Sequence, residues 1–80
     1  METLARTMDD PAMPLAGTTL EVCEPFTTLC CAMVWPMGAQ LRVEKQTSPN
    51  RLLILSLTHA PGGLHNVKRS TLRRCTRPLG

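Results

Sequence analysis

The pattern of apolar and polar positions predicts three short strands in the middle of the chain. Residues 40–44, QLRVE, alternate polar and apolar side chains, which is the period of a half-buried strand. Residues 27–35 contain β-branched and aromatic side chains, which favour the pleated surface of a sheet. Residues 52–58 form the third expected strand. Alternation in this strand puts three leucines on one face: Leu53, Leu55 and Leu57.

Two turns that contain proline separate the expected strands. Residues 35–38, WPMG, fit a type I turn with proline at the second position and glycine at the fourth. Residues 48–51, SPNR, fit such a turn more closely, because Ser, Pro and Asn all stand at favoured positions. Residues 19–22 suit a short extended segment. We therefore expect a small β-leaning unit, a three-stranded meander, with disordered N- and C-terminal segments.

A short helix over residues 49–59 is the alternative to the third strand. Ser48 is a suitable N-cap, and Pro49 is favoured at the first helical position. Leucine favours helices, and the periodicity of a short apolar run does not separate a helix from a strand. In this alternative, the chain outside the helix is mostly disordered.

Composition limits how stable such a unit can be. The chain has 80 residues, which allow one small domain, and small domains bury a low share of their surface. It contains one Trp, one Phe and no Tyr, but five Met, so large rigid core residues are scarce. Arginine outnumbers lysine seven to two, as in a GC-rich reading frame. We expect a weakly stable apolar unit over residues 19–59, between a flexible acidic segment (1–18) and a flexible basic tail (60–80).

The charges divide the chain around one uncharged stretch, residues 25–41. Before it, five acidic residues stand against one arginine, a net of −4; after it, eight basic residues stand against one glutamate, a net of +7. The stretch is shorter than the roughly 20 apolar residues that a membrane span needs. Shallow membrane association of residues 25–41, assisted by Trp35 and the basic tail, remains an alternative.

The N-terminal residues and the cysteines bear on the compartment and on chemistry. Residues 1–17 are acidic and broken by prolines, unlike a secretory signal, so we expect a cytoplasmic or nuclear protein, with the membrane as the alternative. The four cysteines lack the paired spacing of structural zinc sites, and we expect no metal or cofactor. Cys30 and Cys31 lie within the uncharged stretch and are candidates for S-acylation. No motif for nucleophilic or phosphate-transfer catalysis occurs, which indicates a non-enzymatic protein.

The basic tail holds the residues that we expect to contact a partner or a phosphate: Lys68, Arg69, Arg73, Arg74 and Arg77. If the tail becomes helical on binding, Arg69, Arg73 and Arg77 share one face. Thr71 and Thr76 follow basic residues, as phosphorylation sites of basophilic kinases do. The tail has no aromatic residue to stack on bases, so its expected partner is an acidic protein or a nucleic-acid backbone.

These features together predict a short protein without enzymatic activity that binds a larger partner through its basic tail. Two alternatives stay open. The chain is a small membrane-associated protein that uses residues 25–41, or it is the unselected product of a GC-rich reading frame with no defined function.

Overall fold

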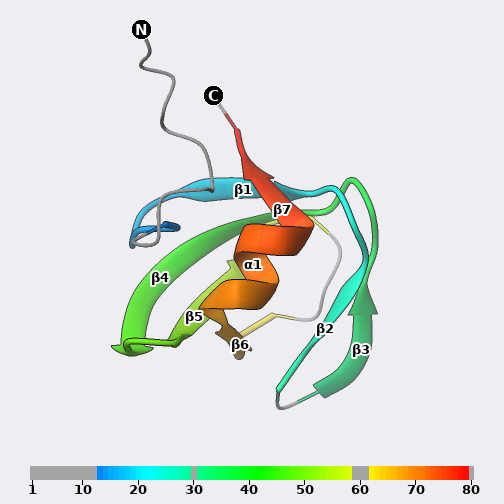
Figure 1. Ribbon diagram of the computed structural model, residues 1–80. Coiled ribbons are helices and arrows are strands. Elements are labelled where there is room, and N and C mark those ends of the chain that lie inside the picture. The colour runs from blue at the N-terminus through cyan, green and yellow to red at the C-terminus, as the bar shows by residue number, and fades with distance from the viewer. Residues whose placement is uncertain (1–12, 30, 59–61, 80) are drawn as a thin grey trace, which may run out of the picture.

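The computed structural model describes residues 13–29, 31–58 and 62–79; of Cys31 and Ala32 it describes only the backbone. The described part is strand-rich, as expected, but it forms seven strands in two sheets rather than a three-stranded meander. The elements are β1 (Thr19–Val22), β2 (Phe26–Thr28), β3 (Cys31–Trp35), β4 (Gln40–Ser48), β5 (Arg51–Ser56), β6 (Leu64–Lys68), α1 (Arg69–Cys75) and β7 (Thr76–Pro78). Five strands form an antiparallel sheet in the order β6-β5-β4-β1-β7, and β2 pairs with β3 (Figure 1).

The hairpin of β4 and β5 confirms the second and third expected strands and the turn between them. Ser48 lies opposite Arg51, so only Pro49 and Asn50 form the connection. Leu41 and Val43 are buried and Arg42 is exposed, as the alternation of residues 40–44 indicates. The alternative of a helix over residues 49–59 is wrong, because residues 51–56 are the strand β5.

The expected strand over residues 27–35 is wrong in one respect: it is two strands, β2 and β3, that fold back on each other. Their pairing places Phe26 opposite Trp35, with ring centroids 5.7 Å apart in a stacked arrangement. Trp35 also meets His65 of β6 edge-on, at 5.4 Å. Aromatic pairs of this kind stabilise a hairpin beyond the area that they bury. Phe26 and Trp35 therefore close the open end of the hairpin, and the contact with His65 joins the hairpin to β6.

The turn after β3 lies one residue later than the sequence predicts. The backbone N–H of Ala39 donates to the carbonyl oxygen of Pro36 at 3.1 Å, so the turn runs from Pro36 to Ala39. Gly38 is then its third residue and has φ +92°. A type II turn requires a positive φ at this position, and glycine is the residue that adopts it without strain.

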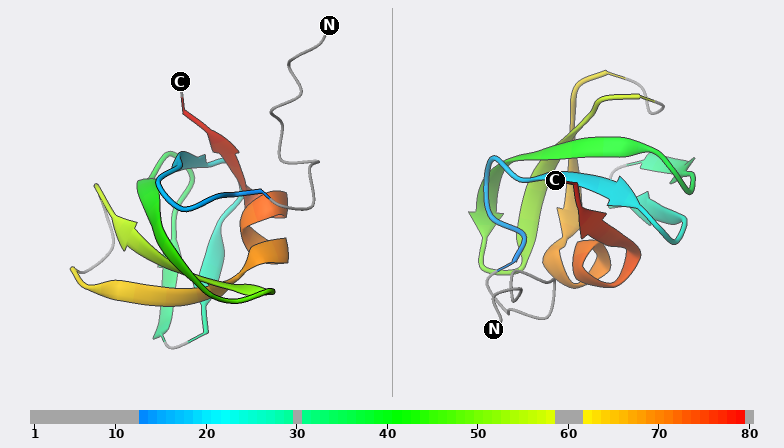
Figure 2. Two further views of the ribbon diagram at one scale, coloured as in Figure 1. Left: turned by 90° about the vertical axis from the view of Figure 1, so that its left-hand side faces the viewer. Right: turned by 90° about the horizontal axis from the view of Figure 1, so that it is seen from above.

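Regular structure over residues 64–78 corrects the expectation of a loop followed by an unstructured tail. β6 pairs with β5, and β7 pairs with β1, so both ends of the basic segment belong to the sheet. α1 joins the two edge strands directly (Figures 1 and 2). It ends at Cys75 because Thr76 is extended, with φ −133°. This segment has few large apolar side chains of its own. It is ordered because its two strands pair with β5 and β1 of the sheet.

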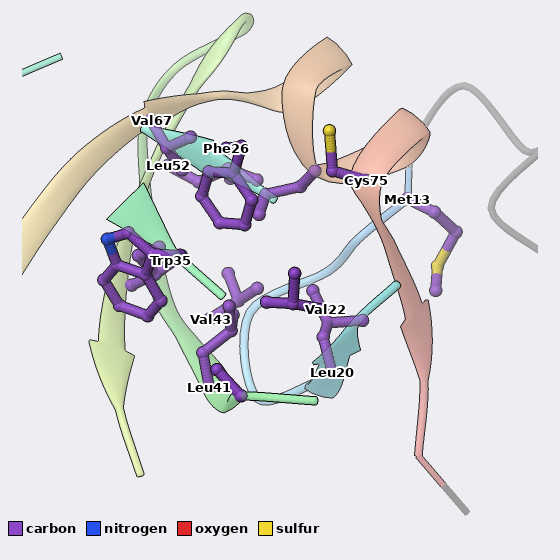
Figure 3. Close-up of a cluster of buried hydrophobic side chains, with 13 residues drawn as sticks. Met13, Leu20, Val22, Phe26, Trp35, Leu41, Val43, Leu52, Val67 and Cys75 are labelled. Carbon is purple, nitrogen blue, oxygen red and sulfur yellow. The ribbon is translucent and has the colours of Figure 1, made fainter. Parts of the chain in front are cut away.

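The core lies between the curved sheet, the β2–β3 hairpin and α1 (Figure 3). On β5 the buried side chains are Leu52 and Ile54, while Leu53 and Leu55 lie on the partly exposed face and Leu57 follows the strand and is exposed. The register decides this, since Ile54 pairs with the buried Val43 of β4. The buried apolar residues are Met13, Leu20, Val22, Phe26, Trp35, Ala39, Leu41, Val43, Leu52, Ile54, Val67, Leu72 and Cys75.

The last residues of the acidic segment, 13–18, pack onto this core, although we expected residues 1–18 to be flexible. Met13 and Pro14 are buried. The backbone N–H of Gly17 donates to the carbonyl oxygen of Val43 at 2.7 Å, and Val43 donates to Thr18 at 2.9 Å. Residues 1–12 lie outside the described part of the chain, so the prediction for them is not tested.

Candidate anion-binding site

Basic residues from three elements line one pocket of about 600 Å³ at the end of the β4–β5 hairpin. We call it the basic pocket. Its lining residues are Pro49, Asn50, Arg51, Lys68, Arg69, Ser70 and Arg73. Four of these seven residues are cationic and none is acidic. Lys68, Arg69 and Arg73 belong to the set that the sequence predicts for partner or phosphate contact, and the structure brings them together.

The sheet register and the start of α1 build this pocket. Arg51, the first residue of β5, lies directly opposite Lys68, the last residue of β6. α1 begins at the next residue, and the backbone N–H of Arg69 donates to the carbonyl oxygen of Asn50 at 2.7 Å. Arg73 follows one helical turn later on the same face. Positions that are 17 or more residues apart in the sequence therefore meet.

Arg69 forms the floor of the pocket and fixes its shape. Its side chain is buried, with 9% of its surface exposed. Nε donates to the carbonyl oxygen of Pro49 at 3.1 Å, and Nη1 donates to that of Pro14 at 3.1 Å. Nη2 donates to Oε1 of Gln46. A planar guanidinium with five donors suits this arrangement, because three acceptors approach from different directions. Arg69 ties α1 to the hairpin and to the N-terminal segment.

Three basic side chains line the pocket besides Arg69: Arg51, Lys68 and Arg73. We call them the rim residues, and they concentrate positive charge there. Arg51 and Lys68 are exposed and face each other across the β5–β6 ladder. Like charges directly opposite each other in an antiparallel pair destabilise the pairing. Within the part of the chain that the structure describes, neither of them forms an ion pair. An anion bound between them would relieve the repulsion.

Arg74 and Arg77, also predicted to contact a partner, lie outside the basic pocket. Nε of Arg74 lies 3.6 Å from Oε1 of Glu24, and Nη2 of Arg77 lies 2.9 Å from Oε1 of Glu21. The expectation that Arg69, Arg73 and Arg77 share a helix face is wrong for the last, which belongs to β7. Both arginines are instead paired with acidic residues of the N-terminal half.

The candidate modification sites differ in accessibility. Thr76 is buried, and its Oγ1 donates to the carbonyl oxygen of Leu72 at 2.5 Å, so the hydroxyl is enclosed in the folded chain. Thr71 is half-buried and lines a second pocket, of about 410 Å³, together with Arg74 and residues of the β2–β3 hairpin. Cys30 and the side chain of Cys31 lie outside the described residues, so their acylation stays a prediction.

The uncharged stretch, residues 25–41, forms β2, β3, the turn and the first residues of β4. Trp35, expected to assist membrane association, is 1% exposed and belongs to the core. The exposed large apolar side chains of the stretch are Leu29, Met33, Val34 and Met37. Among the described helices, none has the length and apolar character to cross a bilayer. Shallow association through the hairpin stays a prediction.

Four members of the pocket were not predicted from the sequence: Pro49, Asn50, Arg51 and Ser70. Nothing local marks Arg51, because its place depends on the pairing of β5 with β6. Among the described residues, no group of three or more His, Cys, Asp or Glu side chains is arranged to hold a metal ion. The lining of the basic pocket, with four cationic residues and no acidic one, suits an anion.

Comparisons with known proteins found no protein family, no curated protein and no solved structure that matches this chain.

Proposed function

We propose that this chain is a non-enzymatic binding module whose basic pocket receives an anionic group of a larger protein. One observation carries the proposal: Arg51, Lys68 and Arg73 line one pocket together with the buried Arg69, and no lining residue is acidic. Arginine forks bind carboxylate and phosphate oxygens through paired hydrogen bonds, and lysine adds a point charge. Arg69 already has its acceptors within the chain, so the rim residues make the direct contacts.

The distribution of charge favours a compact anionic group over an extended polyanion. Outside the pocket, three arginines are paired with glutamates: Arg42 with Glu44, Arg74 with Glu24, and Arg77 with Glu21. A nucleic-acid backbone is bound through many phosphate contacts along a track, and these pairs interrupt such a track. The pocket lining also has no aromatic side chain on which a base could stack. We therefore favour a protein with clustered acidic or phosphorylated side chains.

The test uses a fluorescent peptide that carries one phosphoserine among acidic residues, titrated with the purified chain. We expect the double variant Arg51→Ala/Arg73→Ala to lose at least tenfold in affinity, since each lost charge-assisted contact is worth about 1.5–3 kcal/mol. The matched control is Arg42→Ala/Arg77→Ala, which also removes two positive charges, but at positions outside the pocket. We expect this control to change affinity less than about threefold, because exposed ion pairs contribute little.

Two further measurements sharpen the result. Binding should weaken as salt rises, because the rim charges are exposed to solvent. A single-stranded oligonucleotide of equal charge should bind more weakly than the peptide. Equal losses in the two double variants would show that net charge, and not the pocket, governs binding, and would refute the proposal.

A further inference from the structure

Cys23 and Cys75 lie opposite each other where β1 and α1 end. The register of β1 with β7 pairs Val22 with Thr76, and the next pair in this register is Cys23 with Cys75. Cys75 is the last residue of α1 and lies outside the ladder, but the backbone N–H of Cys23 donates to its carbonyl oxygen at 2.8 Å. With standard backbone bond lengths, this hydrogen bond keeps the two Cα atoms within about 7 Å of each other. Disulfides join Cα atoms that are about 4.4–6.8 Å apart.

Each thiol contacts a group that belongs to the other cysteine or to its neighbour in the chain. The Cys23 thiol donates to the carbonyl oxygen of Cys75 at 3.3 Å, so its sulfur lies beside the Cys75 backbone. The Cys75 thiol donates to Oε1 of Glu24, the neighbour of Cys23, at 3.6 Å. The backbone N–H of Glu24 also donates to Cys75, at 3.0 Å. These contacts hold the β1–β2 connection against the last residue of α1. Both cysteines are free, so no disulfide joins them in this structure.

The environments of the two thiols differ. Cys23 is exposed, whereas Cys75 is 1% exposed at the α1 side of the core (Figure 3). Burial raises the pKa of the Cys75 thiol, although the charge of Arg74 opposes this shift. A dissolved oxidant therefore reaches Cys23 first, and Cys75 is placed to react with the product.

We propose that Cys23 and Cys75 are an oxidisable pair that forms a disulfide when the protein meets a hydroperoxide. The Cys23 thiolate attacks one oxygen of hydrogen peroxide; an S–O bond forms, the O–O bond breaks, and the hydroxide released takes up a proton to become water. The Cys75 sulfur then attacks the Cys23 sulfur, so that the S–S bond forms and the S–O bond breaks. The Cys75 proton passes to the facing Glu24 carboxylate, and the hydroxide that leaves Cys23 is protonated to a second water. Two thiols lose two electrons, and one peroxide gains them.

This disulfide would fasten α1 to the β1–β2 connection. The two cysteines are 52 positions apart, so the link closes a long loop and restricts the unfolded chain. It would also fix the end of the helix that carries Arg69 and Arg73. The inference does not depend on the proposed anion binding, because it involves neither the pocket rim nor a partner.

The experiment treats the full chain, in a Cys30→Ser/Cys31→Ser background, with hydrogen peroxide and follows its intact mass. We expect a monomer that has lost two hydrogen atoms, a peptide with Cys23 joined to a peptide with Cys75, and a raised thermal midpoint. Dithiothreitol should restore the original mass and midpoint. In the further variant Cys75→Ser, Cys23 should instead gain one oxygen atom.

A matched control moves one thiol out of register. Glu21→Cys/Cys23→Ser keeps two thiols but places the first opposite Arg77 instead of Cys75. We expect it to cross-link at least tenfold more slowly within one chain. The proposal is overturned if the original pair loses no hydrogen atoms, or if the control cross-links equally fast.

Discussion

Replacing Arg69 by methionine tests whether this buried guanidinium holds the fold together. Methionine has a similar length and preserves the helix, but it donates no hydrogen bond. The change removes the donors to the carbonyl oxygens of Pro49 and Pro14 and to the side chain of Gln46. Helix, hairpin and N-terminal segment would then keep their backbone hydrogen bonds and apolar contacts but lose these side-chain bonds.

The structure sets the size of the expected loss. The bond to Pro14 is buried, and leaving that oxygen without a donor costs about 1–3 kcal/mol. Gln46 and Pro49 lie at the surface, where water can replace the donor, so each of these bonds contributes about 0.5–1.5 kcal/mol. Methionine regains part of this through apolar burial. We expect the free energy of unfolding to fall by about 2–4 kcal/mol. This is a large fraction of the total free energy of unfolding of a domain of this size.

Urea denaturation followed by circular dichroism measures this change. At an unchanged slope, the midpoint should fall by about 1–3 M. Arg69→Lys keeps the charge but not the planar fork, so it should lose about half as much. The matched control is Lys68→Met, one residue earlier and exposed, which should stay within about 0.5 kcal/mol. An Arg69→Met protein as stable as this control would refute the structural role of the guanidinium.

Three further predictions concern the core, a turn and a modification site. Trp35→Ala should lower the free energy of unfolding, measured by urea denaturation, by about 3–5 kcal/mol, because Trp35 is 1% exposed and stacks on Phe26. A loss below about 1 kcal/mol would contradict this packing. Gly38→Ala should lower the free energy of unfolding by about 1–2 kcal/mol, because φ at this position is +92°. The control Gly62→Ala should lower it by less than about 0.5 kcal/mol, because φ there is not positive and no atom lies within 4 Å of the new Cβ. Equal thermal midpoints of the two variants would contradict the turn assignment. A basophilic kinase should leave Thr76 unmodified in the folded chain, because its hydroxyl is buried. Phosphopeptide mapping should show modification of Thr76 in the urea-unfolded chain and in the corresponding peptide. Rapid phosphorylation of the folded protein would argue against that burial.

Local sequence determined the elements that form between neighbours in the chain. The hairpin of β4 and β5 follows from the SPNR turn and the alternation of QLRVE, because both signals act over a few residues. The charged residues of the basic pocket were partly predictable in the same way. Lys68, Arg69 and Arg73 fall within residues 68–73, so their proximity along the chain keeps them close.

Only the tertiary structure decided how distant segments pair. Trp35 contacts His65 of β6, which joins the β2–β3 hairpin to the sheet, and the buried face of β5 depends on its register with β4. Arg51 joins the pocket because β6 pairs with β5, and Arg69 is buried because Pro14 supplies an acceptor from 55 positions away. Neither contact leaves a local period or motif, since each reflects pairing energy between parts of the chain that meet only in the fold. The sequence therefore determined which charges were present, and the sheet register determined which of them share a site.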